Sequence, residues 1–221
     1  MAESSAEPRA HRDAAFLAAK RARLDEPHVA GLNALAAQVE RSTRRPAPRV
    51  DPDSGGTAAR VLLLLETPSV AGTYGSGLIS LDNDDATAAN LLRAVQEAGL
   101  PREELVVWNA VPWFVGTRER GITPSAAELR LGRTWLLPFL TLLPRLEVVV
   151  ALGRSAQAAV THLSTATPEL GGRRFTVLLA PHPSQRVYNR PGFEGRARVH
   201  AALAGAAAAL RPDGPGAGEA R

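Results

Sequence analysis

Short apolar runs alternate with helical patterns through the middle of the chain. Four runs rich in leucine and β-branched residues cover residues 61–65, 105–107, 146–152 and 175–179. Between and after them, apolar residues recur every three to four positions, as in amphipathic helices, at residues 84–98, 125–143, 155–163 and 194–210. Strands that are apolar on both faces and separated by helices belong to parallel sheets covered on both sides. The pattern therefore predicts an α/β fold, a three-layer α/β/α sandwich with a mostly parallel, four-stranded central sheet.

The segments outside this region have a different character. Residues 10–24 and 27–41 show helical patterns, the second with Asp25 as a candidate N-cap. Residues 42–56 contain three prolines and two glycines, which is typical of a linker or a wrapped loop. We therefore expect an N-terminal helical arm with a Pro/Gly-rich linker at 1–57, one α/β domain at 58–211 and a disordered tail at 212–221.

Composition narrows the class of protein. The 221 residues are 45% hydrophobic and 22% charged, as in ordinary globular proteins, and they include no Cys. Disulfides, thiolate zinc sites and Cys-ligated iron–sulfur clusters are therefore excluded. The apolar runs are too short to cross a bilayer, and the first residues lack the basic and apolar regions of a signal peptide. We expect a cytoplasmic protein with no membrane partner.

Positive charge is concentrated in one part of the chain. The chain contains 25 Arg and a single Lys, which together with abundant Ala, Gly and Pro is typical of a GC-rich genome, and the net charge is +4. Residues 170–200 are called the basic window below, and they contain one acidic residue, Glu194. The same window contains six arginines: Arg173, Arg174, Arg186, Arg190, Arg196 and Arg198. This local excess favours a surface that faces a polyanion, although a solvated charged face is the alternative.

Polar residues follow the predicted strands. Parallel sheets bind ligands at the carboxyl ends of their strands. The residues at these ends include Glu66, Thr67, Pro68 and Ser69 after the first strand, Asn109 at the second, Arg154 after the third and His182 after the fourth. A carboxylate, an amide, a helix N-terminus and an imidazole are therefore expected at one edge of the sheet.

Two of these residues suit the recognition and chemistry of a base. His182 lies between two prolines, which hold it on a stiff turn, and its imidazole could donate to an oxygen that becomes negative in a transition state. Asn109 carries a flat amide that can pair with the edge of a nucleobase. The alternatives are a histidine without a role and an amide that bonds to loop backbone.

Other features support less specific hypotheses. The acidic cluster at 82–85 can cap the following helix, or one of its carboxylates can orient a water molecule. The glycine-rich segment 72–77 matches neither nucleotide-binding loop pattern and suits close backbone approach to a ligand. A hydrolase nucleophile at Ser155 lacks the expected final glycine, and no Asp precedes His182 in the required order. Metal-binding spacings are absent, so neither a metal nor a cofactor is expected.

Three motifs resemble the uracil-DNA glycosylase superfamily. They are Leu-Glu-Thr-Pro-Ser at the end of the first strand, Asn-Ala-Val at the second and His-Pro-Ser after the fourth, and the resemblance covers roughly residues 61–210. The family fold is an α/β/α sandwich. The resemblance implies a monomeric, monofunctional DNA glycosylase that flips a deaminated base out of DNA and hydrolyses its N-glycosidic bond in base-excision repair. Because the chain has no Cys, the resemblance is to a bacterial-type member without an iron–sulfur cluster.

The resemblance also implies roles for residues in the catalytic site. His182 would stabilise negative charge on the 2-carbonyl oxygen of the leaving uracil, and Asn109 would bind its imide N–H and 4-carbonyl. Glu66 stands at the glutamate of a Gly-Glu-Ala-Pro-Gly motif, with Pro68 at its proline. Because Thr67 occupies the position that often holds a water-activating Asp or Asn, a downstream carboxylate is expected to orient the water, either Asp82 or Asp85.

Further contacts to the base and to DNA follow from the same resemblance. No aromatic residue between 78 and 81 matches the one that stacks on uracil, so Tyr74 or Trp113 is expected to substitute. The segment 183–188 would enter the minor groove. The DNA-binding residues expected are Ser184, Gln185, Arg186, Tyr188, Arg190 and Arg154.

Two other functions remain open from the sequence. Thr67 favours a non-catalytic, nucleic-acid-binding member of the same fold. A hydrolase of small nucleotides or nucleosides is the third possibility, but the arginines around His182 argue against it.

Overall fold

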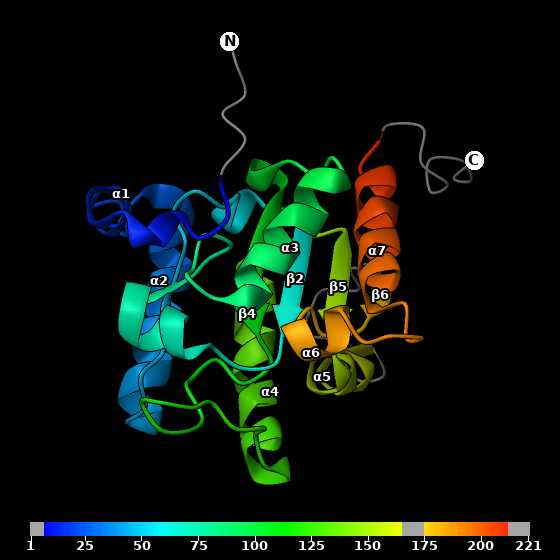
Figure 1. Ribbon diagram of the computed structural model, residues 1–221. Coiled ribbons are helices and arrows are strands. Elements are labelled where there is room, and N and C mark those ends of the chain that lie inside the picture. Colours follow the sequence, from blue (N-terminus) through cyan, green and yellow to red (C-terminus); the bar gives the residue numbers. More distant parts are fainter. Residues whose placement is uncertain (1–6, 165–174, 212–221) are drawn as a thin grey trace, which may run out of the picture.

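The computed structural model describes residues 7–164 and 175–211 and has a parallel sheet at its centre (Figure 1). The sheet is formed by four strands in the order β4-β2-β5-β6, and all neighbouring pairs are parallel. The strands are β2 (Val61–Leu65), β4 (Leu105–Asn109), β5 (Val148–Leu152) and β6 (Thr176–Ala180). The predicted tail at 212–221 lies outside the described residues.

Helices cover both faces of this sheet (Figure 1). On one face, α3 (Ala86–Glu97) contacts α7 (Gly195–Ala209), which packs on β5 and β6. On the other, α4 (Ala126–Thr141) contacts α5 (Arg154–Ser164), which packs on β2 and β5. The predicted three-layer α/β/α sandwich is therefore confirmed. Among the described helices, none is both long and apolar enough to cross a bilayer.

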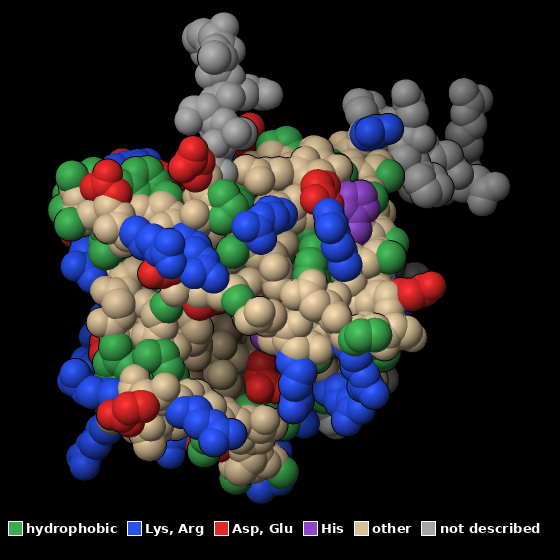
Figure 2. Space-filling view, in the orientation of Figure 1, with side chains coloured by type: hydrophobic (Ala, Val, Ile, Leu, Met, Phe, Trp, Pro, Cys, Tyr) green, Lys and Arg blue, Asp and Glu red, His purple; other side chains and the backbone are tan. Residues whose placement is uncertain are grey.

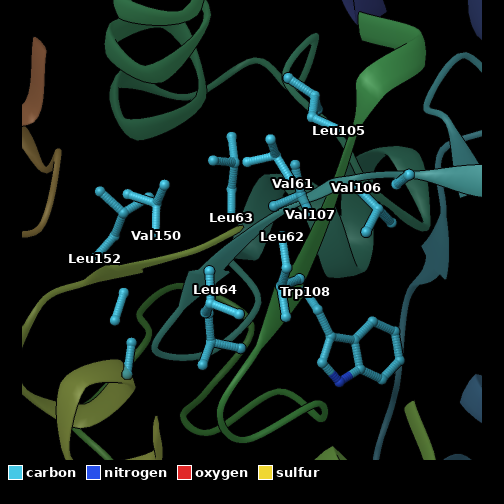
Figure 3. Packing of buried hydrophobic residues seen from close by; sticks show 14 of the residues in the cluster. Val61, Leu62, Leu63, Leu64, Leu105, Val106, Val107, Trp108, Val150 and Leu152 are labelled. Carbon is cyan, nitrogen blue, oxygen red and sulfur yellow. The ribbon is translucent and has the colours of Figure 1, made fainter. Parts of the chain in front are cut away.

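The apolar side chains of the strands form the core (Figure 3). Val61, Leu62, Leu63 and Leu64 are each completely buried, as expected for a central strand covered on both faces. Trp108 of β4 stacks on Phe139 of α4 with ring centroids 4.2 Å apart. Complete burial of large apolar side chains on both faces provides most of the free energy that holds the layers together.

Capping explains where the helices begin. Asp85 caps α3 by accepting from the backbone N–H of Ala88, and Ser125 forms a reciprocal capping box with Glu128 at α4. The prediction that Asp25 caps the second helix is wrong. That helix, α2 (Pro27–Thr43), begins with a proline whose missing N–H needs no cap, and Glu26 holds the N-cap position without a side-chain bond.

The N-terminal helical arm packs against the sheet domain. It contains η1 (Ala10–Arg12), α1 (Ala14–Arg21) and α2, and buried residues of α2 belong to the main core. Part of the predicted linker is ordered, because β1 (Arg49–Val50) pairs in parallel with β3 (Leu78–Ile79). The linker thereby reaches the segment that follows β2. The remaining short elements are η2 (Gly56–Ala58), η3 (Ala71–Ser76), η4 (Arg102–Glu104) and α6 (Gln185–Tyr188).

The order of the strands determines where a ligand can bind. The chain passes from β2 to β4 on one side of β2 and then crosses to β5 on the other side. The connections of β2 and β5 therefore leave in opposite directions, and a crevice opens between the carboxyl ends of these two strands.

Candidate active site

A cavity of about 380 Å³, called the main cavity below, opens at the carboxyl ends of the strands. Figure 2 shows a hollow in this face with acidic and imidazole side chains inside it and basic side chains around its rim. The structure brings seven residues predicted from the sequence to the wall of this cavity: Glu66, Thr67, Pro68, Ser69, Asp85, Asn109 and His182. It does not bring Asp82, Tyr74 or Trp113 there.

His182 is held as a neutral hydrogen-bond donor. Its Nδ1 accepts from the backbone N–H of Ser184 at 3.1 Å, so the neutral ring carries its proton on Nε2. Burial lowers the pKa of His182, and this effect exceeds the opposite effects of Glu66 and Asp85. A neutral imidazole with an Nε2 proton can donate to an oxygen of a bound base.

Gly153 makes room for this imidazole. It follows β5 with a φ of 95°, and a Cβ built there would lie 3.0 Å from the Cβ of His182. The turn into α5 and the turn after β6 therefore pack closely together. This contact positions His182 against the end of the neighbouring strand.

Asn109 presents an unpaired amide. It is the last residue of β4, its side chain is 2% exposed, and its Nδ2 has no hydrogen-bond partner among the described residues. A buried N–H without an acceptor is costly, and such groups in native proteins usually meet a ligand or water. Because Asn109 lines the main cavity, a carbonyl oxygen of a bound base can complete this bond.

A side-chain hydrogen bond joins the ends of β2 and β5 at the crevice. The buried Ser155, at the start of α5, donates through Oγ to Oε2 of Glu66 at 2.5 Å. The other oxygen of Glu66, Oε1, has no hydrogen-bond partner in the described ranges. Glu66 is therefore held in place by one oxygen and leaves the other for a ligand. The sequence analysis considered Ser155 only as a nucleophile and missed this contact.

Asp85 has a structural task in the same wall. Its Oδ1 accepts from the Ala88 N–H at 2.8 Å, and its Oδ2 accepts from Ser69 Oγ at 2.8 Å. Ser69 in turn accepts from the N–H of Gly72. These bonds fix the segment after β2 to the start of α3. Asp85 therefore has two roles, because its carboxylate both caps α3 and lines the main cavity.

Asp82 lies outside the main cavity, contrary to its predicted role beside the water. It is completely buried, and its Oδ2 binds Lys20 Nζ at 2.5 Å and Arg102 Nη2 at 2.8 Å. Lys20, the single lysine, also contacts Asp51 at 2.7 Å and Asp53 at 2.9 Å. The sequence could not show this because Lys20 arrives from the N-terminal helical arm, 62 residues earlier in the chain.

One group of side chains near Lys20 has the spacing of a metal site. A ring nitrogen of His11 and carboxylate oxygens of Asp51 and Asp82 lie within 4.8 Å of one another. The ammonium of Lys20 already binds both carboxylates, so a cation would have to displace it. None of these three residues lines the main cavity, although His11 bonds to Asn83 of its wall.

The predicted aromatic substitutes for base stacking are elsewhere. Trp113 is 1% exposed and packs with Val39 and Ala47 in a small second core, so its ring cannot reach a base. Tyr74 lies on η3 beside the main cavity but not in its wall. The wall contains the aliphatic side chains of Leu78 and Ile79 instead.

The sequence analysis also missed wall residues. Asn83, expected only to cap a helix, lines the cavity and accepts from Ser76 Oγ at 2.6 Å. Gly121, Ile122 and Thr123, from the loop between β4 and α4, line it too. No periodicity or motif marks this loop in the sequence.

The expected DNA-binding segment forms a turn that ends in the short helix α6. The carbonyl of Pro183 accepts from Asn90 Nδ2 at 3.0 Å, which ties this turn to α3. Gln185 and Arg186 are exposed, whereas Tyr188 is 7% exposed and belongs to the main core. Burial raises the pKa of Tyr188. The structure thus leaves Gln185 and Arg186 available for DNA but not the ring of Tyr188.

The basic window is partly neutralised. Arg196 pairs with Glu97 at 2.8 Å, while Arg190 and Arg198 lie over the ring of Phe193. Arg173 and Arg174 lie outside the described residues. Two further residues were predicted to contact DNA. In the structure Arg154 is exposed and Ser184 is half-buried.

Comparison with known proteins identifies the family. A sequence model described as the uracil DNA glycosylase superfamily matches residues 52–204, well over half of the chain. A search of curated proteins finds no match. The match spans the sheet, the strand ends and the turn that carries His182. The chain therefore belongs to the uracil DNA glycosylase superfamily.

Proposed function

We propose that the protein flips uracil or another deaminated base out of DNA and hydrolyses its N-glycosidic bond. Membership of the superfamily supports a DNA glycosylase-type function in general. The observation that carries the finer proposal is the pairing, in one cavity, of the unpartnered amide of Asn109 with the neutral imidazole of His182. These two groups supply donors for two carbonyl oxygens of a pyrimidine.

His182 acts on the leaving base. Cleavage of the glycosidic bond builds negative charge on the base and positive charge on the sugar. The Nε2–H of His182 donates to the carbonyl oxygen that gains this charge, and a donor fixed in advance lowers the barrier by roughly 3 kcal/mol. The Ser184 N–H bond to Nδ1 keeps the ring in the tautomer that this step needs.

Glu66 acts on the water and the sugar. With Oε2 held by Ser155, its carboxylate presents Oε1 to orient a water molecule and to stabilise the positive sugar. Asp85 contributes a second negative charge to the cavity while it holds Ser69. This assignment places the carboxylate function on residues of the main cavity, with Thr67 beside them.

Product analysis tests the proposal. Single- and double-stranded oligonucleotides containing uracil, hypoxanthine or xanthine are incubated with the protein, and abasic sites are then cleaved. We expect base release, with kcat/KM reduced roughly 10²–10³-fold in His182→Ala. The control Leu131→Ala changes an exposed leucine on α4 outside the main cavity and should retain full activity.

Other outcomes identify the alternatives. Full activity in His182→Ala contradicts the mechanism. Salt-dependent DNA binding without release of any base indicates the non-catalytic binder that Thr67 favours. Turnover of free nucleosides without affinity for DNA indicates a small-molecule hydrolase.

A further inference from the structure

A second hollow, called the side cavity below, adjoins the main cavity. Its volume is about 410 Å³, and its wall includes Tyr74 of η3, Phe114 after β4 and Ile122 before α4. Ile122 lines both cavities, so they lie next to each other. Tyr74 is 38% exposed and Ile122 is 55% exposed. Two of the four large hydrophobic side chains that are exposed in the described ranges therefore meet at this place, which indicates a binding surface.

The ring of Tyr74 already accommodates a planar group. Phe114 meets Tyr74 at 5.2 Å with an interplanar angle of 73°, which fixes the tyrosine ring edge-on. The guanidinium of Arg118 lies over the face of Tyr74, 4.9 Å from its centroid. A nucleobase is also planar, and it stacks on aromatic side chains in the same way. When Arg118 moves aside, a base can stack on the face of the Tyr74 ring that the guanidinium now covers.

The charges around the side cavity favour a nucleic acid. Arg118 and Arg120 stand on either side of the exposed Glu119 on the turn at 116–121, and neither arginine forms an ion pair with a described residue. The one carboxylate in the wall, Glu128, is neutralised by Arg45 at 2.5 Å. Unpaired arginines at the rim can bind phosphates on either side of a stacked base.

The turn that carries these arginines is held firmly. Gly116 and Gly121 form an isolated bridge, and the N–H of Ile122 donates to the carbonyl of Val115 at 2.9 Å. Gly116 has a φ of 140°, and a Cβ there would lie 2.2 Å from the carbonyl oxygen of Arg120. The turn therefore needs glycine at this position, and it presents Arg118 beside Tyr74 in a defined place.

We propose that the side cavity binds the base next to the one excised, stacked on Tyr74, and that the substrate is DNA that is single-stranded around the target. Arg118 then leaves the ring and pairs with the neighbouring phosphate. Two adjacent bases in separate cavities cannot both keep their partners in a duplex, whereas a single strand offers both without the cost of unpairing. This inference rests on the proposed function, because the main cavity must hold the excised base.

Fluorescence of a neighbouring base tests the inference. The probe is a single strand with 2′-fluoro-2′-deoxyuridine, whose glycosidic bond resists cleavage, and with 2-aminopurine directly 5′ or 3′ to it. We expect quenching at one of the two positions on binding. Tyr74→Ala should abolish this quenching and weaken single-strand binding about tenfold, with a smaller effect on duplex. Tyr74→Phe keeps the ring and should behave like the wild type.

The control and the contradicting outcomes are distinct. Leu131→Ala removes another exposed apolar side chain, 48% exposed, that lines neither cavity, and it should not change the signal. Equal quenching and equal Kd for wild type and Tyr74→Ala overturn the inference. Release of uracil is measured separately with an unmodified strand. Release of uracil together with equal quenching in the wild type and Tyr74→Ala overturns only the inference. Tyr74-dependent quenching without release of uracil overturns the proposed function and leaves only the stacking of a base on Tyr74.

Discussion

At the residue scale, the environment of His182 affects both its protonation and the stability of the fold. Burial keeps the ring neutral, and the carboxylates of Glu66 and Asp85 act in the opposite direction with smaller effect. The folded protein therefore binds this proton at lower pH than the unfolded chain, whose histidine titrates near 6.5. The active form of the donor persists below that pH.

This difference predicts a pH-dependent stability. As the pH falls below 6.5, the unfolded chain takes up a proton that the folded state does not, so the free energy of unfolding should fall until the lower folded pKa is reached. Urea unfolding at pH 7.5 and 5.5 measures the change. The pKa of His11 is lowered as well, so the comparison is with His182→Gln, in which the decrease should be smaller. An identical decrease in both proteins contradicts the burial argument.

Ser155 is predicted to be a positioning residue for Glu66. Ser155→Ala removes the donor to Oε2, so the carboxylate gains freedom and kcat should fall about tenfold with little change in KM. Thr134→Ala, which removes an exposed hydroxyl bonded to a backbone carbonyl of α4, is the matched control. An unchanged kcat, or a loss that appears in KM instead of kcat, contradicts a positioning role.

At the scale of elements, the site depends on how two turns meet. The turn into α5 and the turn after β6 belong to neighbouring strands, and Gly153 lets the second pass close to the first. This arrangement explains why a glycine follows β5 and why the imidazole lies at the strand ends. The position of His182 therefore depends on both turns and not on either one alone.

Substitutions at two glycines with positive φ distinguish an effect on stability from an effect on catalysis. Gly153→Ala places a methyl group 3.0 Å from His182 Cβ at a φ of 95°, whereas Gly99→Ala at a φ of 63° meets no atom within 4 Å. Each should cost about 1–3 kcal/mol in the free energy of unfolding, measured with urea. Only Gly153→Ala should also lower kcat, because it displaces His182. Equal activities of the two variants would show that the contact does not position the imidazole.

At the scale of the whole molecule, one buried ion cluster joins the N-terminal helical arm to the sheet domain. Burial acts to lower the pKa of Lys20, but Asp51 and Asp82 outweigh it, and the pKa is raised. The ammonium is therefore charged and bonded to carboxylates that come from the predicted linker and from the segment before α3. That segment continues into Asn83 of the main cavity, so the arm supports the site.

Removal of this lysine should destabilise the protein strongly. Lys20→Ala leaves the buried carboxylates of Asp51 and Asp82 without their main partner, at a cost of about 3–5 kcal/mol measured by urea unfolding. The control Arg12→Ala breaks an exposed pair with Asp84, which the solvent screens, and should change the free energy of unfolding far less than Lys20→Ala does. A loss below about 1 kcal/mol for Lys20→Ala would contradict a stabilising role of the cluster.

The sequence by itself determined the layers and the edge of the sheet that binds ligands. Apolar strand runs and amphipathic helices are local patterns, so the four strands, their order along the chain and the polar residues at their ends could be identified without coordinates. Glu66, Asn109 and His182 were found in this way because each follows or ends such a run.

Only the tertiary structure decided between residues that are equivalent in the sequence. Asp82 and Asp85 lie three positions apart, yet Lys20 from a distant helix takes the first while the second caps α3 and lines the main cavity. Tyr74 and Ser155 likewise obtain their neighbours, Phe114 and Glu66, through contacts between segments far apart in the chain. Such contacts depend on long-range packing, which leaves no periodic trace in the sequence.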